Sequence, residues 1–239
     1  LNFTGLSKFV GIDVLGFLLS LDLGGSASFS MQLMALGITM LLAVLLGMGM
    51  PAVPAYINVA LLMGPLLIGL GLATFTAHMF IFYFAVASAI TPPVALAAFA
   101  ASTITKAEPM ATGFSAVRSG IVMFVIPFIF AFYPELLLID QALIDPSSPG
   151  KEFLPGYEDG VTVIALLWLL ARLIFALYLI ASALSRYDTG PLSMPWVLIR
   201  LAVAATVLAK AETIYLAAIA VGVGLLIVHR VMNRQSIAA

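Results

Sequence analysis

Two short motifs stand out in an otherwise apolar sequence because their residue types can expose backbone groups and hydroxyls. The first is GMGMP at 47–51 and the second is SAITPP at 88–93. Glycine commonly ends a helix and proline suits the first turn of the next one, so each motif should set a helix C-terminus against a helix N-terminus. Carbonyls at a helix C-terminus attract cations, and amides at an N-terminus attract anions. The chemistry predicted for the pair is binding of a cation together with an anionic solute.

Three polar side chains near these motifs are further candidates. His78 is the only Asp, Glu, Lys, Arg or His between Asp22 and Lys106, and an ionisable residue at membrane depth is a functional candidate by default. Its roles are a proton relay or, alternatively, a hydrogen-bonded packing residue. Tyr56 and Asn58 follow the first motif and either contact the solute or bond another helix.

The composition identifies the kind of protein that must position these residues. The chain is 63% hydrophobic and 9% charged, whereas a soluble domain is roughly 45–50% apolar and about 25% charged. No Asp, Glu, Lys or Arg lies between Leu23 and Thr105, which is room for several membrane crossings. A net charge of -1 without basic clusters argues against nucleic acid, and the absence of Cys excludes disulfides and thiolate metal sites. The sequence therefore predicts an all-α polytopic membrane protein.

Hydropathy and helix-breaking residues divide the first half of the chain into four elements. Residues 5–22 read as an amphipathic helix at the membrane interface. Residues 29–70 read as a re-entrant hairpin, because two helices of roughly 16 residues reach only about 24 Å each. Residues 75–104 form a helix that the second motif must break, since successive prolines remove amide donors. Residues 113–138 are long enough to span. Broken backbone at membrane depth is tolerated only where it is buried in protein or lines a polar cavity, so the breaks indicate a site.

The second half reads as a separate module. Residues 139–160 are acidic and contain prolines, which predicts a solvated loop, and 161–239 hold further transmembrane helices. Arg172 and Arg200 lie in the middle of apolar segments, at a cost of roughly 2.5–3.5 kcal/mol each unless partnered. We expect them to snorkel or to pair at a helix or protomer contact, with Glu212 or a missing segment as candidate partners, and the alternative is a role in transport. A basic C-terminal end predicts a cytoplasmic C-terminus and a periplasmic 139–160 loop. The apolar segments of this half are 161–184, 191–209 and 213–228.

Three long runs carry a family resemblance: GMGMPAVPAYINVALLMGP, AHMFIFYFAVASAITPPVALAAFAAS and KAEPMATGFSAVRSGIVMFVIPFIF. They resemble the large membrane subunit of tripartite ATP-independent periplasmic (TRAP) transporters. The likeness covers residues 3–138 and is greatest to the fused form that works with TAXI-type binding proteins. It implies an elevator-type ion-transporter fold in which residues 1–138 are the second inverted repeat: an arm helix, the hairpin, the broken helix and a spanning helix. The first repeat is then missing, and we expect the chain to be the C-terminal part of a longer polypeptide.

The resemblance also assigns residues to an ion and substrate site. It implies a Na⁺ site at Gly47, Gly49, Ser88 and Thr91. The complete set comprises the hairpin tip and the helix break: Gly47, Met48, Gly49, Met50, Pro51, Ser88, Ala89, Ile90, Thr91, Pro92 and Pro93.

The function expected on these grounds is secondary active, cation-coupled uptake of a small carboxylate-containing solute by an elevator mechanism. A periplasmic TAXI-type protein would deliver the solute to a bacterial or archaeal inner membrane, and the first repeat and small-subunit-like helices would be further partners. Na⁺ is favoured because no carboxylate lies between Leu23 and Thr105; H⁺, through His78, is the alternative. Other classes are an ion channel and a structural assembly subunit. An enzyme is not expected, because the apolar run holds no acid for an aspartyl protease and no metal-binding His pair.

Overall fold

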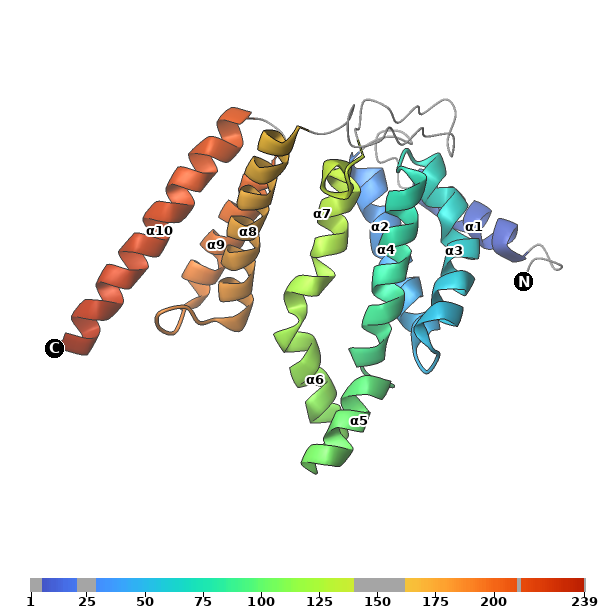
Figure 1. The fold of residues 1–239 in the computed structure, drawn as a ribbon, viewed down its shortest axis with the longest axis horizontal. Helices are drawn as coiled ribbons and strands as arrows, with labels where there is room; N and C mark the ends of the chain where they lie inside the picture. The colour runs from blue at the N-terminus through green and yellow to red at the C-terminus, as the bar shows by residue number, and fades with distance from the viewer. Residues whose placement is uncertain (1–5, 21–28, 140–161, 210–211, 239) are drawn as a thin grey trace. The chain divides into compact units, whose positions relative to one another are not determined.

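The computed structural model describes residues 6–20, 29–139, 162–209 and 212–238 (Figure 1). Two compact units comprise Leu1–Val161, the N-terminal unit, and Thr162–Ala239, the C-terminal unit. In both units the described secondary structure consists of helices and 3-10 turns. Tyr187 and Pro191 form an isolated β-bridge. The helices of the N-terminal unit are α1 (Leu6–Ser20), α2 (Phe29–Gly47), α3 (Ala52–Gly69), α4 (Thr74–Ala87), α5 (Leu96–Thr105), α6 (Pro109–Ser119) and α7 (Ile126–Phe132), with 3-10 turns η1 (Ser88–Ile90), η2 (Ile121–Phe124) and η3 (Pro134–Leu137).

The core of the N-terminal unit forms where α2, α3 and α4 pack together. Phe80 and Phe84 of α4 are fully buried, and their rings meet at 4.9 Å between centroids. Phe128 of α7 packs edge-on against Phe80 at 5.2 Å. Such aromatic pairs bury large apolar areas in a preferred geometry. The Phe80–Phe128 pair therefore joins α7 to α4, which also packs on α2 and α3.

The predicted hairpin is present as α2 and α3, joined by residues 48–51 (Figure 1). Its helices have 19 and 18 residues, longer than the roughly 16 that the sequence suggested, and each is long and apolar enough to be a candidate span. The base of the hairpin is closed by Gln32, whose Nε2 donates to the carbonyl oxygen of Leu70 at 2.8 Å. The hairpin is therefore tied together at the end opposite its tip.

The other elements predicted for this unit can be compared with the helices of the structure one by one. Over 75–104, where the sequence predicted a broken helix, the chain forms α4, η1 and α5. Over residues 113–138, where the sequence predicted one spanning helix, the chain forms α6, η2, α7 and η3. The segments Pro109–Ser119 and Ile121–Phe132 are bent by 66° from each other, and together they have the length and composition of one broken span or a re-entrant loop. Gly120 follows the end of α6, and Pro127, which has no amide hydrogen, lies in the first turn of α7. The helix expected over 5–22 is α1, but its polar and apolar residues are not separated onto opposite faces.

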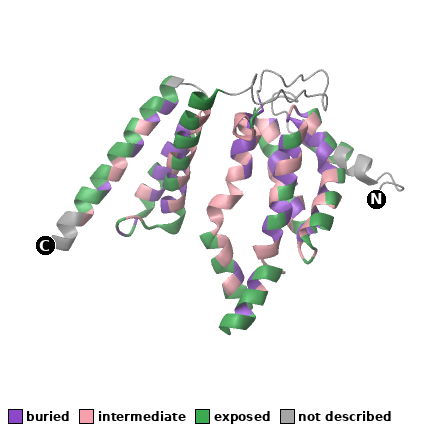
Figure 2. Cartoon of the chain, viewed as in Figure 1, coloured by how far each residue is buried: buried purple, intermediate pink, exposed green. Residues whose placement is uncertain are grey.

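The C-terminal unit consists of α8 (Val163–Ser185), α9 (Met194–Val207) and α10 (Glu212–Ala238), and α9 packs against both of the others. These helices lie over the three segments that the sequence predicted, and α10 runs further than expected. Figure 2 shows exposed residues along much of α8 and α10, and they include Ile164, Ile174 and Ile227. Apolar side chains facing outward suit a lipid environment. Four described helices are candidate spans, α2, α3, α8 and Thr213–Asn233 of α10, so the chain is a polytopic membrane protein.

Candidate ion and solute site

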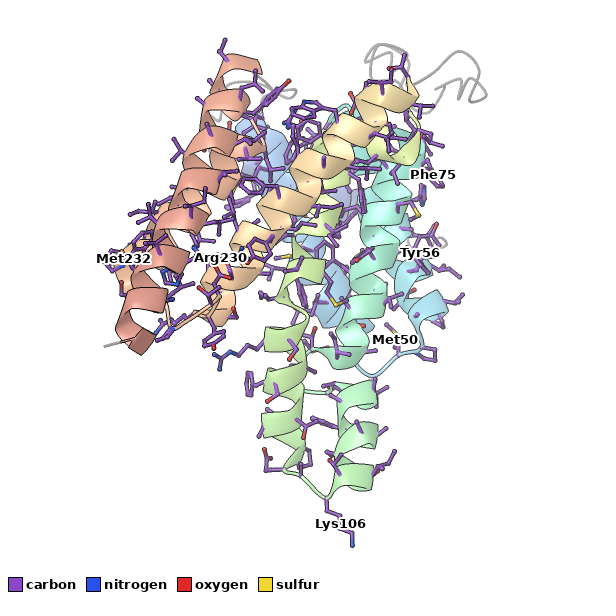
Figure 3. The ribbon with its side chains drawn as sticks, turned by 60° about the vertical axis from the view of Figure 1, so that its left-hand side comes forward. Met50, Tyr56, Phe75, Lys106, Arg230 and Met232 are labelled. Carbon is purple, nitrogen blue, oxygen red and sulfur yellow. The ribbon has the colours of Figure 1, made fainter. Side chains whose placement is uncertain are left out.

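The tip of the hairpin lies directly against the helix break. Gly47 is the last residue of α2, and a Cβ placed on it would be 2.5 Å from the Oγ and 2.8 Å from the Cβ of Ser88. Gly49 has φ +78, a conformation that L residues rarely adopt, and its Cβ position lies 3.6 Å from Cγ1 of Val94. Figure 3 shows Met50 in the connection between α2 and α3. The fold thus brings together the two motifs that the sequence singled out.

The two hydroxyls of the break keep their oxygens available as acceptors. Ser88 is buried, and its Oγ donates to the carbonyl oxygen of Ala85 at 2.6 Å. Thr91, which is half-buried, donates from Oγ1 to the carbonyl oxygen of Ala87 at 2.8 Å. A hydroxyl has one hydrogen and two lone pairs, so each oxygen can still accept or coordinate. Both side chains can therefore act as cation ligands.

The backbone of the break supplies helix ends on either side. After η1 the chain is extended at Thr91, passes through the cis peptide Pro92–Pro93, and turns at Ala95, which has φ 32 and ψ 53, into α5. Pro51 is likewise extended before α3 begins. Among the described residues, no side chain caps the first turn of α3 or of α5. Amides in these first turns lack intrahelical acceptors, so both helices present free donors near the contact.

The other polar candidates bond within the hairpin arm and α4. Asn58 Nδ2 lies 3.9 Å from the sulfur of Met50, which connects α3 back to the tip. The hydroxyl of Tyr56 is 2.9 Å from Nδ1 of His78, and both side chains are half-buried. Tyr56 and His78 thus make the interhelical hydrogen bond that the sequence offered as the alternative to solute contact or proton relay.

A third element, α6, also contacts the break, and the sequence gave no reason to expect it. A Cβ on Gly113 would lie 3.0 Å from Cγ of Pro92 and 3.6 Å from Cβ of Ala95. A Cβ on Gly120 would lie 3.7 Å from Cδ1 of Ile90. A single glycine in an apolar segment is a weak signal, since glycine is common in membrane helices. Only the tertiary contact identifies Gly113.

Arg172 is partnered within the C-terminal unit. Its Nη2 donates to the carbonyl oxygens of Val207 and Ala209, each at 3.1 Å. Its guanidinium lies 3.8 Å above the ring of Tyr215, within the range of a cation–π contact. Because α9 ends at Val207, the arginine caps carbonyls that the helix leaves unpaired.

Arg200, in the middle of α9, is fully buried and paired. It donates to Asp188 Oδ2 at 2.8 Å and to Ser182 Oγ at 2.6 Å, and the hydroxyl of Tyr178 donates to Asp188 at 2.6 Å. Burial by itself would raise the pKa of Asp188, but the hydrogen bonds from Tyr178 and Arg200 and the charge of Arg200 lower it below its usual value. The expected pairing of both arginines at helix contacts is confirmed. Asp188, in the loop between α8 and α9, is a partner that the sequence did not indicate.

Within the described residues, no cluster of three or more His, Asp or Glu could hold a metal ion. Residues 6–143 match the family described as tripartite ATP-independent periplasmic transporter, DctM component. This match covers more than half of the chain and includes both motifs. No similar curated protein and no similar solved structure was found. The fused, TAXI-associated form therefore stays a prediction, while the chain itself belongs to the DctM family, the large permease component of tripartite ATP-independent periplasmic (TRAP) transporters.

Proposed function

We propose that this chain carries one half of a sodium-coupled uptake pathway for small carboxylate-containing solutes. The observation that supports it most is the contact between Gly47 and Ser88, because it joins the ends of two discontinuous helices in a TRAP permease component. Permeases of this family work with a periplasmic binding protein and a small subunit, and we take the binding protein here to be of the TAXI type. Residues 1–138 would be the second transport repeat and 161–239 an accessory module.

The coupling ion would lie between the hairpin tip and the break. Ser88 and Thr91 offer hydroxyl oxygens, and Gly47 and Gly49 offer backbone carbonyls at the end of α2. These ligands are all oxygen, which hard cations prefer, and the negative end of the α2 dipole favours a positive charge. A sodium ion needs no titrating ligand, and no Asp or Glu lies between Leu23 and Thr105. The donor set therefore fits sodium better than a proton.

The solute would bind beside the ion, at the first turns of α3 and α5. No side chain caps these turns in the described structure, so their amides are available to a carboxylate. The same two motifs thus supply the cation ligands and the anion donors. Binding of the ion orders backbone that the solute also needs, and by linkage each then raises the affinity for the other.

In the proposed cycle the hairpin moves as one rigid body. Gln32 closes its base, and the contact of Asn58 with Met50 ties α3 to the tip. In an elevator cycle such a body would carry the site with it rather than rearrange around it. The membrane would be the inner membrane of a bacterium or archaeon, with the C-terminus in the cytoplasm, and the first repeat would complete the pathway.

Uptake in proteoliposomes tests this proposal. The complete transporter is reconstituted with its binding protein, a panel of small radiolabelled carboxylates is offered, and a sodium gradient or a proton gradient is imposed separately. We expect saturable uptake that needs both the binding protein and sodium. Uptake driven by protons in sodium-free buffer, and abolished in His78→Gln, would overturn the sodium assignment. Conduction that does not saturate and ignores the binding protein would favour a channel instead.

A further inference from the structure

The helix break is enclosed by glycines on two sides. Gly47 at the end of α2 touches Ser88 at the start of the break, and Gly113 of α6 touches Pro92 and Ala95 at its end. Gly113 is buried, and a Cβ on it would lie 3.0 Å from Cγ of Pro92, which is closer than ordinary van der Waals contact. Neither helix leaves space for a side chain at these points. The position of the break is therefore set from both directions.

Ala95 is the residue at which the break is most constrained. It has φ 32, although it carries a side chain, and it is fully buried. Its amide donates to the carbonyl oxygen of Thr91 at 3.2 Å, and its own carbonyl oxygen accepts from the amide of Phe99 at 2.9 Å. Left-handed backbone at a residue other than glycine persists only where the surroundings impose it, and it is concentrated at functional sites. Gly113 is part of those surroundings, since its Cβ position lies 3.6 Å from the Cβ of Ala95.

The start of α6 is itself fixed. Glu108 is the N-cap of α6 and accepts hydrogen bonds from the amides of Met110, at 3.0 Å, and Ala111. A carboxylate at this position satisfies two of the amides that a helix start leaves unpaired and also favours the positive end of the dipole. Gly113 lies one turn after this cap, so fixing the start of α6 also fixes the position of Gly113 next to Pro92. Figure 3 shows α5 and α6 side by side above Lys106, which marks the turn between them.

We propose that α6 is the third wall of the ion site and that Gly113 and Ala95 are positioning residues for it. Gly113 contacts Pro92 and Ala95, whereas the hairpin contacts the break at Ser88. Because Thr91 directly precedes Pro92, the contact with α6 fixes the position from which the Thr91 hydroxyl would bind the ion. The inference rests on the proposed sodium site and adds residues that the motifs did not contain. Neither residue touches the ion; both act through Thr91 and Pro92.

Sodium binding to the purified full-length protein tests the wall. The unfolding temperature is measured against sodium chloride, with choline chloride at equal ionic strength as the reference. Gly113→Ala should raise the half-saturating sodium concentration roughly three- to tenfold, because a ligand displaced by tenths of an ångström loses much of its contribution. Ala95→Gly should raise it too, without lowering the unfolding temperature in choline. Gly37→Ala is the matched control, because a Cβ there meets no atom within 4 Å.

A second measurement does not depend on sodium. Residues 1–239 contain no cysteine, so Thr91→Cys adds one thiol to this part of the chain. In a background whose cysteines elsewhere in the full-length protein are replaced by serine, the rate at which a maleimide labels this thiol reports how the break is packed. Adding Gly113→Ala should speed labelling several-fold, and adding Gly37→Ala should not. If sodium chloride stabilises the wild-type protein no more than choline chloride does, the sodium proposal is refuted. The labelling experiment still tests whether α6 holds the break in place. The inference is overturned if Gly113→Ala leaves the labelling rate unchanged. It is also overturned if wild type binds sodium and the folded Ala95→Gly protein has the same half-saturating sodium concentration.

Discussion

The backbone of Gly47 lies so close to Ser88 that a methyl group on the glycine would stand 2.5 Å from the serine oxygen. This contact joins residues that are far apart in the sequence and that end different helices. It exists only because one partner has no side chain and the other has a small one. The contact explains why the first motif must begin with glycine rather than with any residue able to end a helix.

Gly47→Ala should separate the hairpin tip from the break. The added methyl group overlaps both Oγ and Cβ of Ser88, so rotating the hydroxyl does not relieve the clash, and we expect a loss of about 1–3 kcal/mol in stability. Uptake should fall roughly ten- to hundredfold, because the ligands on the two helices are displaced. Ser88→Gly in the same protein removes both clashing atoms and should restore the unfolding temperature. Full uptake in Gly47→Ala, measured in proteoliposomes, would show that the close contact is not needed.

Thr91→Val keeps the volume of the side chain and removes its oxygen. We expect the protein to reach the membrane in normal amounts and the sodium concentration for half-maximal uptake to rise about tenfold, the effect of losing roughly 1.4 kcal/mol from one ligand. Thr103→Val is a matched control, since that exposed threonine bonds only its own helix in α5. Normal uptake with unchanged ion dependence in Thr91→Val would remove the hydroxyl from the site.

Tyr56→Phe should affect stability rather than ion coupling. The substitution removes the hydroxyl that bonds Nδ1 of His78 at 2.9 Å, and the loss of one such bond typically costs about 0.5–1.5 kcal/mol. We expect a lower unfolding temperature and the same dependence of uptake on sodium. If uptake in Tyr56→Phe becomes dependent on a proton gradient, then the pair participates in coupling and the packing interpretation is wrong.

Asp188→Asn should destabilise the C-terminal unit, because it leaves the buried Arg200 without its counter-ion, a change that typically costs about 3–5 kcal/mol. The pKa of Asp188 lies below its usual value, so the pair contributes stability above a pH of about 3.9 and loses it as the pH falls below that. The unfolding temperature of wild type should therefore drop more steeply in acid than that of Asp188→Asn. The double variant Asp188→Asn with Arg200→Met should recover part of the loss; parallel acid profiles would contradict the pairing.

Truncation near Ser147 should leave a folded N-terminal unit, because the chain divides into two compact units. The buried arginines Arg172 and Arg200 find their partners within the C-terminal unit itself. We expect the shortened transporter to reach the membrane and to respond to the binding protein, with altered assembly or stability. Size-exclusion chromatography and uptake check these points. A shortened protein that is intact in the membrane yet transports nothing would show that the C-terminal unit takes part in the cycle.

The sequence by itself determined where helices exist and where they must break. Proline lacks an amide hydrogen and restricts the preceding residue, so the break after Ser88 and the restart at Pro51 follow from local chemistry. Apolar composition likewise located the helical segments, although it made the two helices of the hairpin shorter than they are. The cost of charge in lipid required partners for Arg172 and Arg200. These properties depend on residues close in the chain or on the solvent, and so they can be derived without a fold.

The tertiary structure decided which of these features meet. Gly113 contacts Pro92, and Gly47 contacts Ser88. Segments pack this closely only where the side chains at the contact are small or absent. The sequence does not show which residue a glycine will contact. The expected continuous helix is bent after Gly120, and the tertiary structure shows what α7 then packs on, since its Phe128 meets Phe80 of α4. The sequence did not predict the role of Asp188, because that role depends on how the loop between α8 and α9 folds to place Asp188 next to Arg200. Pairwise contacts between distant segments depend on the whole packing arrangement, and local sequence carries little information about them.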